Sequence, residues 1–132
     1  MTTVAYNHKD KQVCIDSLLV VNSTIVCDHY DKSIEEDGCI FFLCGSVADY
    51  RKLVDCYKGA NYQGIDAAAI MVKDGVAYHC CAGSDGFINI IELNYSTAIG
   101  RGDEVAITAM DYGASALEAV EHASKRTTST GG

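Results

Sequence analysis

The sequence contains no proline and no tryptophan among its 132 residues. A chain of this length ordinarily carries about six or seven prolines. With 48% hydrophobic residues as well, the composition excludes a proline-rich, low-complexity or disordered protein. Tight turns must therefore be built from glycine, asparagine and aspartate. The length is that of one domain, and we expect residues 1–132 to form a single one.

Basic residues are scarce, because 10 Lys and Arg stand against 18 Asp and Glu and give a net charge of −8. They occur as scattered pairs and not as a stripe. Neutralised phosphates supply most of the affinity of nucleic-acid binding proteins, and anionic membranes attract the same basic residues. The sequence therefore predicts no nucleic-acid partner and no membrane partner.

Long apolar runs are also missing. No run approaches the roughly 20 residues that a membrane span requires. The first ten residues carry charge where a secretory signal is apolar. We therefore expect a soluble, cytoplasmic protein. The odd count of seven cysteines agrees with this expectation, because secreted disulfide scaffolds usually have an even number. We expect reduced cysteines that fill the core as small hydrophobic residues.

Motifs for metals and cofactors are weak. Cys80 and Cys81 are neighbours on a predicted strand, so their side chains point to opposite faces and cannot easily share a metal ion. No C-x-x-C pair completes a zinc site. The segment 100–102 reads Gly-Arg-Gly and lacks both the third glycine and the preceding unit of a dinucleotide-binding motif. The sequence predicts no metal and no cofactor.

Strand-like and helix-like segments follow one another in the order strands, helix, strands, two helices. Alternating or β-branched runs predict strands at 2–7, 12–17, 18–21, 23–27, 32–35, 39–44, 66–72, 76–81, 87–93 and 97–99. The continuously apolar run 39–44 is typical of a strand buried on both faces. Helical spacing predicts helices at 47–57, at 103–112 and from a capping box at Ser115 and Glu118 to about residue 125. This order fits a layered α+β fold of two antiparallel sheets with helices outside.

Several stretches resemble one protein family in the same order. The start, Thr2-Thr3-Val4-Ala5, resembles the mature N-terminus of proteasome β-type subunits and of HslV, their bacterial relative. Segment 12–17 resembles the second strand of that family, which ends with an acidic residue, here Asp16. Lys32 follows sixteen residues later, the separation at which the family places its catalytic lysine. The segments 43–49, 66–72, 98–102 and 125–132 continue the resemblance.

The resemblance implies an Ntn-hydrolase-like αββα sandwich of two antiparallel sheets flanked by helices. It implies a shortened version, because the chain stops where relatives continue with further strands. The activity implied is that of a threonine peptidase, which cleaves peptides or unfolded proteins inside a homo-oligomeric ring that an ATPase unfoldase serves. The nucleophile would be Thr2 after removal of Met1. Lys32 would favour its alkoxide, Asp16 would hold Lys32, and the N–H of Gly45 would donate to the oxyanion.

Two departures from the family pattern favour a second interpretation. Arg101 stands where the family usually has Ser, and Thr127 stands where it usually has Asp. Both family residues support the amine of the nucleophile. The alternative is therefore a catalytically inactive homologue that acts in binding, regulation or assembly. A third interpretation is an unrelated two-layer α+β interaction domain, which the absence of an antiparallel sandwich would favour.

Overall fold

The computed structural model describes residues 2–16, 19–21, 24–27 and 32–126. Met1 and Thr127 lie outside these ranges. The strands are β1 (Thr3–Asn7), β2 (Gln12–Ile15), β3 (Leu19–Val21), β4 (Thr24–Cys27), β5 (Ser33–Glu36), β6 (Cys39–Gly45), β7 (Ala67–Lys73), β8 (Val76–Ala82), β9 (Ile88–Glu92) and β10 (Thr97–Gly100). The helices are α1 (Tyr50–Tyr57), α2 (Asp103–Asp111) and α3 (Ala116–Arg126), and a 3₁₀ turn, Val47–Asp49, precedes α1.

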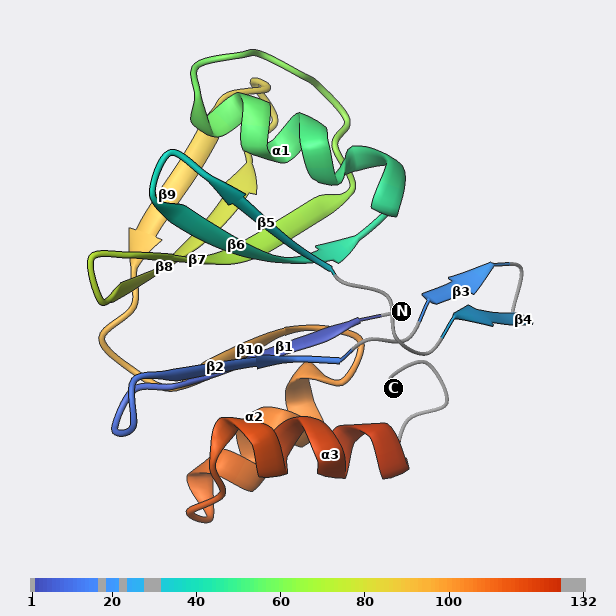
Figure 1. Cartoon of the computed structure of the whole chain (residues 1–132), viewed down its shortest axis with the longest axis vertical. Helices are drawn as coiled ribbons and strands as arrows, with labels where there is room; N and C mark the ends of the chain where they lie inside the picture. The colour runs from blue at the N-terminus through green and yellow to red at the C-terminus, as the bar shows by residue number, and fades with distance from the viewer. Residues whose placement is uncertain (1, 17–18, 22–23, 28–31, 127–132) are drawn as a thin grey trace.

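Two antiparallel sheets form the middle of the molecule. One has the strand order β10-β1-β2 and the other the order β5-β6-β7-β8-β9, while β3 and β4 pair as a separate hairpin. Helix α1 covers the outer face of the five-stranded sheet, and α2 and α3 lie together on the outer face of the three-stranded sheet (Figure 1). The predicted sandwich of two antiparallel sheets between helices is therefore confirmed.

Two hairpins have the proline-free turns that the composition predicts. Asp37 and Gly38 connect β5 to β6, and Asp74 and Gly75 connect β7 to β8. Their φ angles are 52° and 77° in the first turn and 51° and 77° in the second. Positive φ at both central residues is the geometry that matches the twist of the paired strands. These local turns fix the register of the five-stranded sheet.

The core has three parts, one between each pair of neighbouring layers. Between α1 and the five-stranded sheet lie Phe41, Leu43, Leu53, Val54 and Met71. Between the two sheets lie Val4, Tyr6, Cys44, Ile70, Ala77 and Leu93. Under α2 and α3 lie Ala5, Ala98, Ala106, Met110, Ala116, Ala119 and Val120. The small residues of this last group let both helices approach the three-stranded sheet closely.

The expectation that segment 39–44 is buried on both faces is wrong at one position. Cys39, Phe41 and Leu43 point to α1 and are buried, but Ile40 on the other face is 38% exposed. The next residues on that face, Phe42 and Cys44, pack against the three-stranded sheet. Ile40 lies near the β5–β6 turn, outside the area that this sheet covers.

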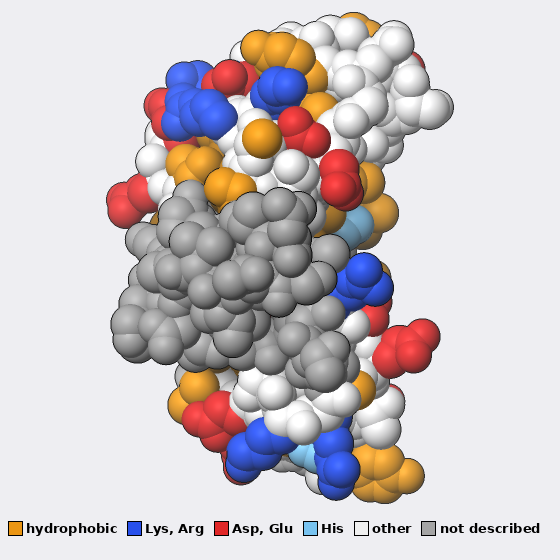
Figure 2. Space-filling view, turned by 90° about the vertical axis from the view of Figure 1, so that its right-hand side faces the viewer, with side chains coloured by type: hydrophobic (Ala, Val, Ile, Leu, Met, Phe, Trp, Pro, Cys, Tyr) orange, Lys and Arg blue, Asp and Glu red, His pale blue; other side chains and the backbone are white. Residues whose placement is uncertain are grey.

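The cysteines of the described ranges agree with the sequence prediction. The six whose side chains the structure describes are free; Cys39, Cys44, Cys56 and Cys80 are buried, and Cys14 and Cys81 are half-buried. The side chain of Cys27 lies outside the description. Within the same ranges, no helix is long and apolar enough to cross a membrane. On the face in Figure 2, acidic and basic side chains lie interspersed at both ends of the molecule.

Candidate active site

Asp16 and Lys32 form an ion pair inside the protein. Asp16 directly follows β2 and Lys32 directly precedes β5, so both lie at strand ends. The Nζ atom of Lys32 is 3.3 Å from Oδ1 of Asp16, and each side chain is only 1% exposed. Charges this deeply buried are tolerated only when they are paired. The structure thus brings together two of the four residues that the resemblance singles out.

The start of β1 is hydrogen-bonded to this ion pair through Thr3. The N–H of Thr3 donates to Oδ1 of Asp16 at 3.0 Å, and the N–H of Asp16 donates to the carbonyl oxygen of Thr3 at 3.2 Å. Thr2 is buried beside it, with 5% exposure. Among the residues described, no hydrogen bond joins the hydroxyl of Thr2 to Asp16 or Lys32, so the link runs through Thr3.

The surroundings of Lys32 act on its proton in opposite directions. Burial lowers the pKa of the Lys32 amine, while the charge and the hydrogen bond of Asp16 raise it. Cys44 lies close enough to interact electrostatically with Lys32. Burial, opposed by a backbone hydrogen bond, raises the pKa of the Cys44 thiol to about 12. A neutral, buried thiol is a poor nucleophile, so Cys44 serves packing here.

Gly45 ends β6 immediately before the turn that leads into α1. Its φ angle is +109°, and an added Cβ would collide with the carbonyl oxygen of Asp66 and lie 2.8 Å from Cα of Ala67. Ser46 donates its N–H to that same carbonyl oxygen at 2.6 Å. Packing of β6 against the start of β7 thus already requires a glycine here. The oxyanion role of Gly45 stays a prediction.

A loop at the end of β10 is hydrogen-bonded to Thr2 and Thr3. The N–H of Arg101 donates to the carbonyl oxygen of Thr2 at 2.9 Å, and the N–H of Gly102 donates to Oγ1 of Thr3 at 2.8 Å. Gly100 has a φ of +95°, and an added Cβ there would collide with the carbonyl oxygen of Thr2. Sequence reasoning missed Thr3, Gly100 and Gly102 as site residues. The Gly-x-Gly spacing was the available signal.

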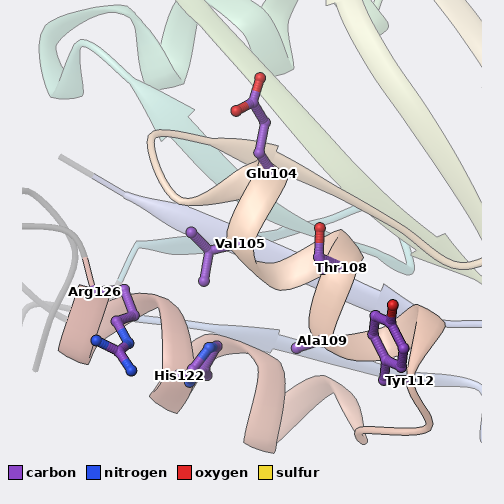
Figure 3. Close-up of a pocket in the computed structure, with 7 residues that line it drawn as sticks. All are labelled: Glu104, Val105, Thr108, Ala109, Tyr112, His122 and Arg126. Atoms are coloured by element: carbon purple, nitrogen blue, oxygen red, sulfur yellow. The ribbon is translucent and has the colours of Figure 1, made fainter.

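A hollow lies away from these residues, between α2 and α3. It has a volume of about 620 Å³ and is lined by Glu104, Val105, Thr108, Ala109, Tyr112, His122 and Arg126. Figure 3 shows Glu104, Val105, Thr108 and Ala109 on α2, Tyr112 directly after it, and His122 and Arg126 on α3. None of Thr2, Asp16, Lys32 and Gly45 lines it. In the described part of the chain, no three His, Cys, Asp or Glu side chains gather as a metal site requires.

Comparison with known proteins gives structural neighbours only. No protein-family model matches the chain, and no curated protein matches it in sequence. Thiobacillus denitrificans BPH in complex with epoxomicin superposes with a TM-score of 0.73 at 14% identity, over 99% of this chain and 93% of that one. Eukaryotic HslV from Trypanosoma brucei gives 0.72 at 15% identity, over 97% and 93%.

The chain has an HslV-like fold. A further structure of Thiobacillus denitrificans BPH agrees, with a TM-score of 0.70 at 14% identity over 98% of this chain and 92% of that one. The third interpretation, an unrelated interaction domain, depended on the absence of the sandwich and loses its support. At such low identity the HslV-like fold carries no chemistry with it, so the chemistry must be argued from the residues.

Proposed function

We propose that the chain is a threonine peptidase of the HslV and proteasome β type, with Thr2 as its nucleophile after removal of Met1. One observation carries this proposal: a buried Asp16–Lys32 pair is hydrogen-bonded to the first strand, one residue from Thr2. Buried ion pairs contribute little to stability, and apolar residues of similar volume often serve as well. A cation at this depth beside the chain start is therefore better explained by chemistry than by folding.

The reaction that suits these groups is acyl transfer. The hydroxyl oxygen of Thr2 attacks the carbonyl carbon of a peptide bond, and its proton passes to the free α-amine of the same residue. That amine has an ordinary pKa of about 7.7–8.0, which suits proton transfer near neutral pH. The protonated amine then gives its proton to the leaving peptide amine, which leaves an ester on Thr2. Water hydrolyses the ester and restores the hydroxyl.

We assign the supporting roles as follows. The charge of Lys32 favours the alkoxide of Thr2, because an opposite charge nearby stabilises the ionised form. Asp16 keeps Lys32 protonated against the effect of burial. The N–H of Gly45 donates to the oxyanion of the tetrahedral intermediate, the group that such donors stabilise most.

We further propose that residues 1–132 act as one domain that assembles into a homo-oligomeric ring in the cytoplasm. Peptides or unfolded proteins are its substrates, and an ATPase unfoldase is its partner. The support for assembly is the HslV-like fold. Native mass spectrometry of the purified protein measures the number of subunits directly, and a monomer at cellular concentrations contradicts this part of the proposal.

The test of the peptidase begins at the N-terminus. Intact-mass analysis of protein from cells should show removal of Met1, which a small residue at position 2 permits. Processed protein should then turn over a fluorogenic peptide, and Thr2→Ala should lower kcat on the order of 1,000-fold or more. Thr108→Ala, which removes an exposed threonine hydroxyl on α2, is the matched control. Full retention of Met1, or equal turnover by wild type and Thr2→Ala, contradicts the proposal.

A second candidate is the catalytically inactive homologue, favoured by Arg101 at the position of the family serine. The backbone N–H of Arg101 already donates to the carbonyl oxygen of Thr2. The Arg101 side chain, however, is exposed and offers no hydroxyl to the α-amine of Thr2. Absence of Thr2-dependent turnover in processed, assembled protein supports this candidate. A gain of turnover in Arg101→Ser identifies this departure as the cause.

A further inference from the structure

Thr3 connects two parts of the candidate site that are far apart in sequence. It is fully buried, lies at the start of β1, and pairs with Gly100 of β10. Its N–H donates to Oδ1 of Asp16 at 3.0 Å. Its Oγ1 accepts from the N–H of Gly102 at 2.8 Å. One residue thus contacts both the buried ion pair and the loop at the end of β10.

The peptide group between Thr2 and Thr3 is held at both ends. Its carbonyl oxygen, on Thr2, accepts from the N–H of Arg101 at 2.9 Å. Its N–H, on Thr3, donates to Asp16. Rotation of this peptide plane changes the direction in which Thr2 projects, and both hydrogen bonds oppose that rotation. The orientation of Thr2 therefore depends on the loop and on the ion pair together.

The hydroxyl of Thr3 keeps the loop in place. Gly102 is the residue directly before α2, where backbone N–H groups have no partner within the helix. Gly102 is itself buried, so water cannot readily replace the threonine oxygen as acceptor. Without this acceptor the N–H of Gly102 becomes a buried, unsatisfied donor. The loop that binds Thr2 then loses one of its hydrogen bonds to β1.

We propose that Thr3 is a positioning residue for Thr2, acting through Gly102 and Asp16. This inference rests on the proposed function, because it assigns Thr3 a part in presenting the nucleophile. Thr3 itself touches neither substrate nor reacting atoms. Small misplacements of a nucleophile lower the rate of the chemical step by large factors, and that step is where the effect of Thr3 lies.

The test compares two substitutions of Thr3 in protein from which Met1 has been removed. Thr3→Val keeps the shape and loses the acceptor, and we expect kcat to fall about tenfold or more with KM little changed. Thr3→Ser keeps the acceptor and should retain most of the turnover. Thr97→Val is the control, because Thr97 pairs with Tyr6 at the other end of β1 and should leave kcat unchanged. Unchanged kcat in Thr3→Val, or an equal loss in Thr97→Val, overturns the proposal.

A second measurement separates this proposal from the proposed function. The pKa of the Thr2 α-amine, followed by NMR, should differ between wild type and Thr3→Val and return in Thr3→Ser. If the amine pKa changes in this way but no turnover depends on Thr2, the positioning role of Thr3 is supported and the proposed peptidase activity is refuted. An unchanged amine pKa refutes the positioning role whatever the turnover. If Thr3→Val does not fold, Thr3→Cys, whose sulfur is a weak acceptor, takes its place with the same expected changes.

Discussion

At the scale of single residues, the Asp16–Lys32 pair has two opposing effects on the folded state. Each side chain gives up its water, and only 1% of either remains exposed. The pair attraction and the N–H of Thr3 on Asp16 offset this loss. Because desolvation and attraction are both large inside a protein, the loss of one partner matters far more than the loss of both.

We therefore predict strong coupling between these two residues in stability. Asp16→Asn and Lys32→Met should each lower the free energy of unfolding by about 3–5 kcal/mol, because each removes the opposite charge of a buried ion pair and keeps the other charge buried. The double variant should lose clearly less than the sum of the two. Urea unfolding of the four proteins measures this cycle, and additive losses contradict the pairing.

The pH dependence of the same proteins gives an independent readout. Burial lowers the pKa of Lys32 in the folded state, so the unfolded chain binds more protons than the folded one between that value and about 10.4. The contribution of Lys32 to stability therefore rises with pH across this window. Lys32→Met should lack this rise. Wild type and Lys32→Met must be compared because burial also raises the pKa of the Cys44 thiol to about 12. That shift makes stability fall as the pH rises, which is opposite to the effect of Lys32.

Gly100 is a second position where the effect of a single substitution on stability can be predicted. Gly100 and Gly113 have φ angles of +95° and +99°, but an added Cβ meets the carbonyl oxygen of Thr2 only at Gly100. Gly113→Ala should cost about 1–2 kcal/mol for the left-handed backbone alone. Gly100→Ala should cost more, because Thr2 must also move, and any turnover should fall. Equal losses in thermal or urea unfolding would falsify the close approach.

At the scale of elements, the start of α3 shows how far local sequence determines structure. The pattern of Ser115 and Glu118 predicts a capping box, and the structure contains both hydrogen bonds. The N–H of Glu118 donates to Oγ of Ser115 at 3.1 Å, and the N–H of Ser115 donates to Oε1 of Glu118 at 3.0 Å. Hydrogen bonds from the backbone N–H and the side chain of Ser115 lower the pKa of the Glu118 carboxyl, so the contribution of this carboxyl to stability disappears as the pH falls through that pKa.

We predict that Ser115→Ala lowers the free energy of unfolding by about 1 kcal/mol, because it leaves an N-terminal N–H of α3 without an acceptor. Ser124→Ala is the matched control. Ser124 lies on the same helix, and its hydroxyl donates only to the carbonyl oxygen of Glu121 one turn earlier. Chemical denaturation of both variants measures the difference. A loss in Ser124→Ala as large as that in Ser115→Ala contradicts the assignment of the cap.

Element types and turns were predictable from the sequence because they depend on neighbours within a few residues. The runs at 2–7, 39–44 and 76–81 became β1, β6 and β8 with ends shifted by one residue. Which part of the molecule covers each face of a strand was not predictable. Exposure of Ile40 depends on where the other sheet ends, and that boundary is set by side chains from distant strands.

The candidate site likewise contains some residues that the sequence could reveal and others that it could not. The separation of Asp16 and Lys32 could be recognised by resemblance, and their contact is local to two strand ends. The part played by Thr3 could not be recognised, because its partner Gly102 lies 99 residues away in the sequence, next to its other partner Gly100. The steric reason for Gly45 is equally hidden, since the clash is with the backbone of β7. No periodic pattern carries such contacts.

At the scale of the whole molecule, the two sheets differ in width. Three strands face five, and β1 and β10 contact β6 and β7. Strand β9 has the last place in the five-stranded order of the described chain, so one row of its backbone groups points away from the sheet. Ile90 and Ile91 in this strand are 43% and 55% exposed, on opposite faces. Exposed apolar edge strands readily pair with another chain.

We predict that this edge contributes to self-association, which a net charge of −8 otherwise opposes. Ile91→Lys places a charge on the edge strand, a device that blocks edge-to-edge pairing, and should shift sedimentation velocity toward smaller species. Leu117→Lys is the control, because it makes the same charge change at a 49% exposed apolar residue on α3, remote from β9. Association reduced equally by both variants shows that the effect is not specific to β9, and association unchanged in Ile91→Lys excludes β9 as a contact.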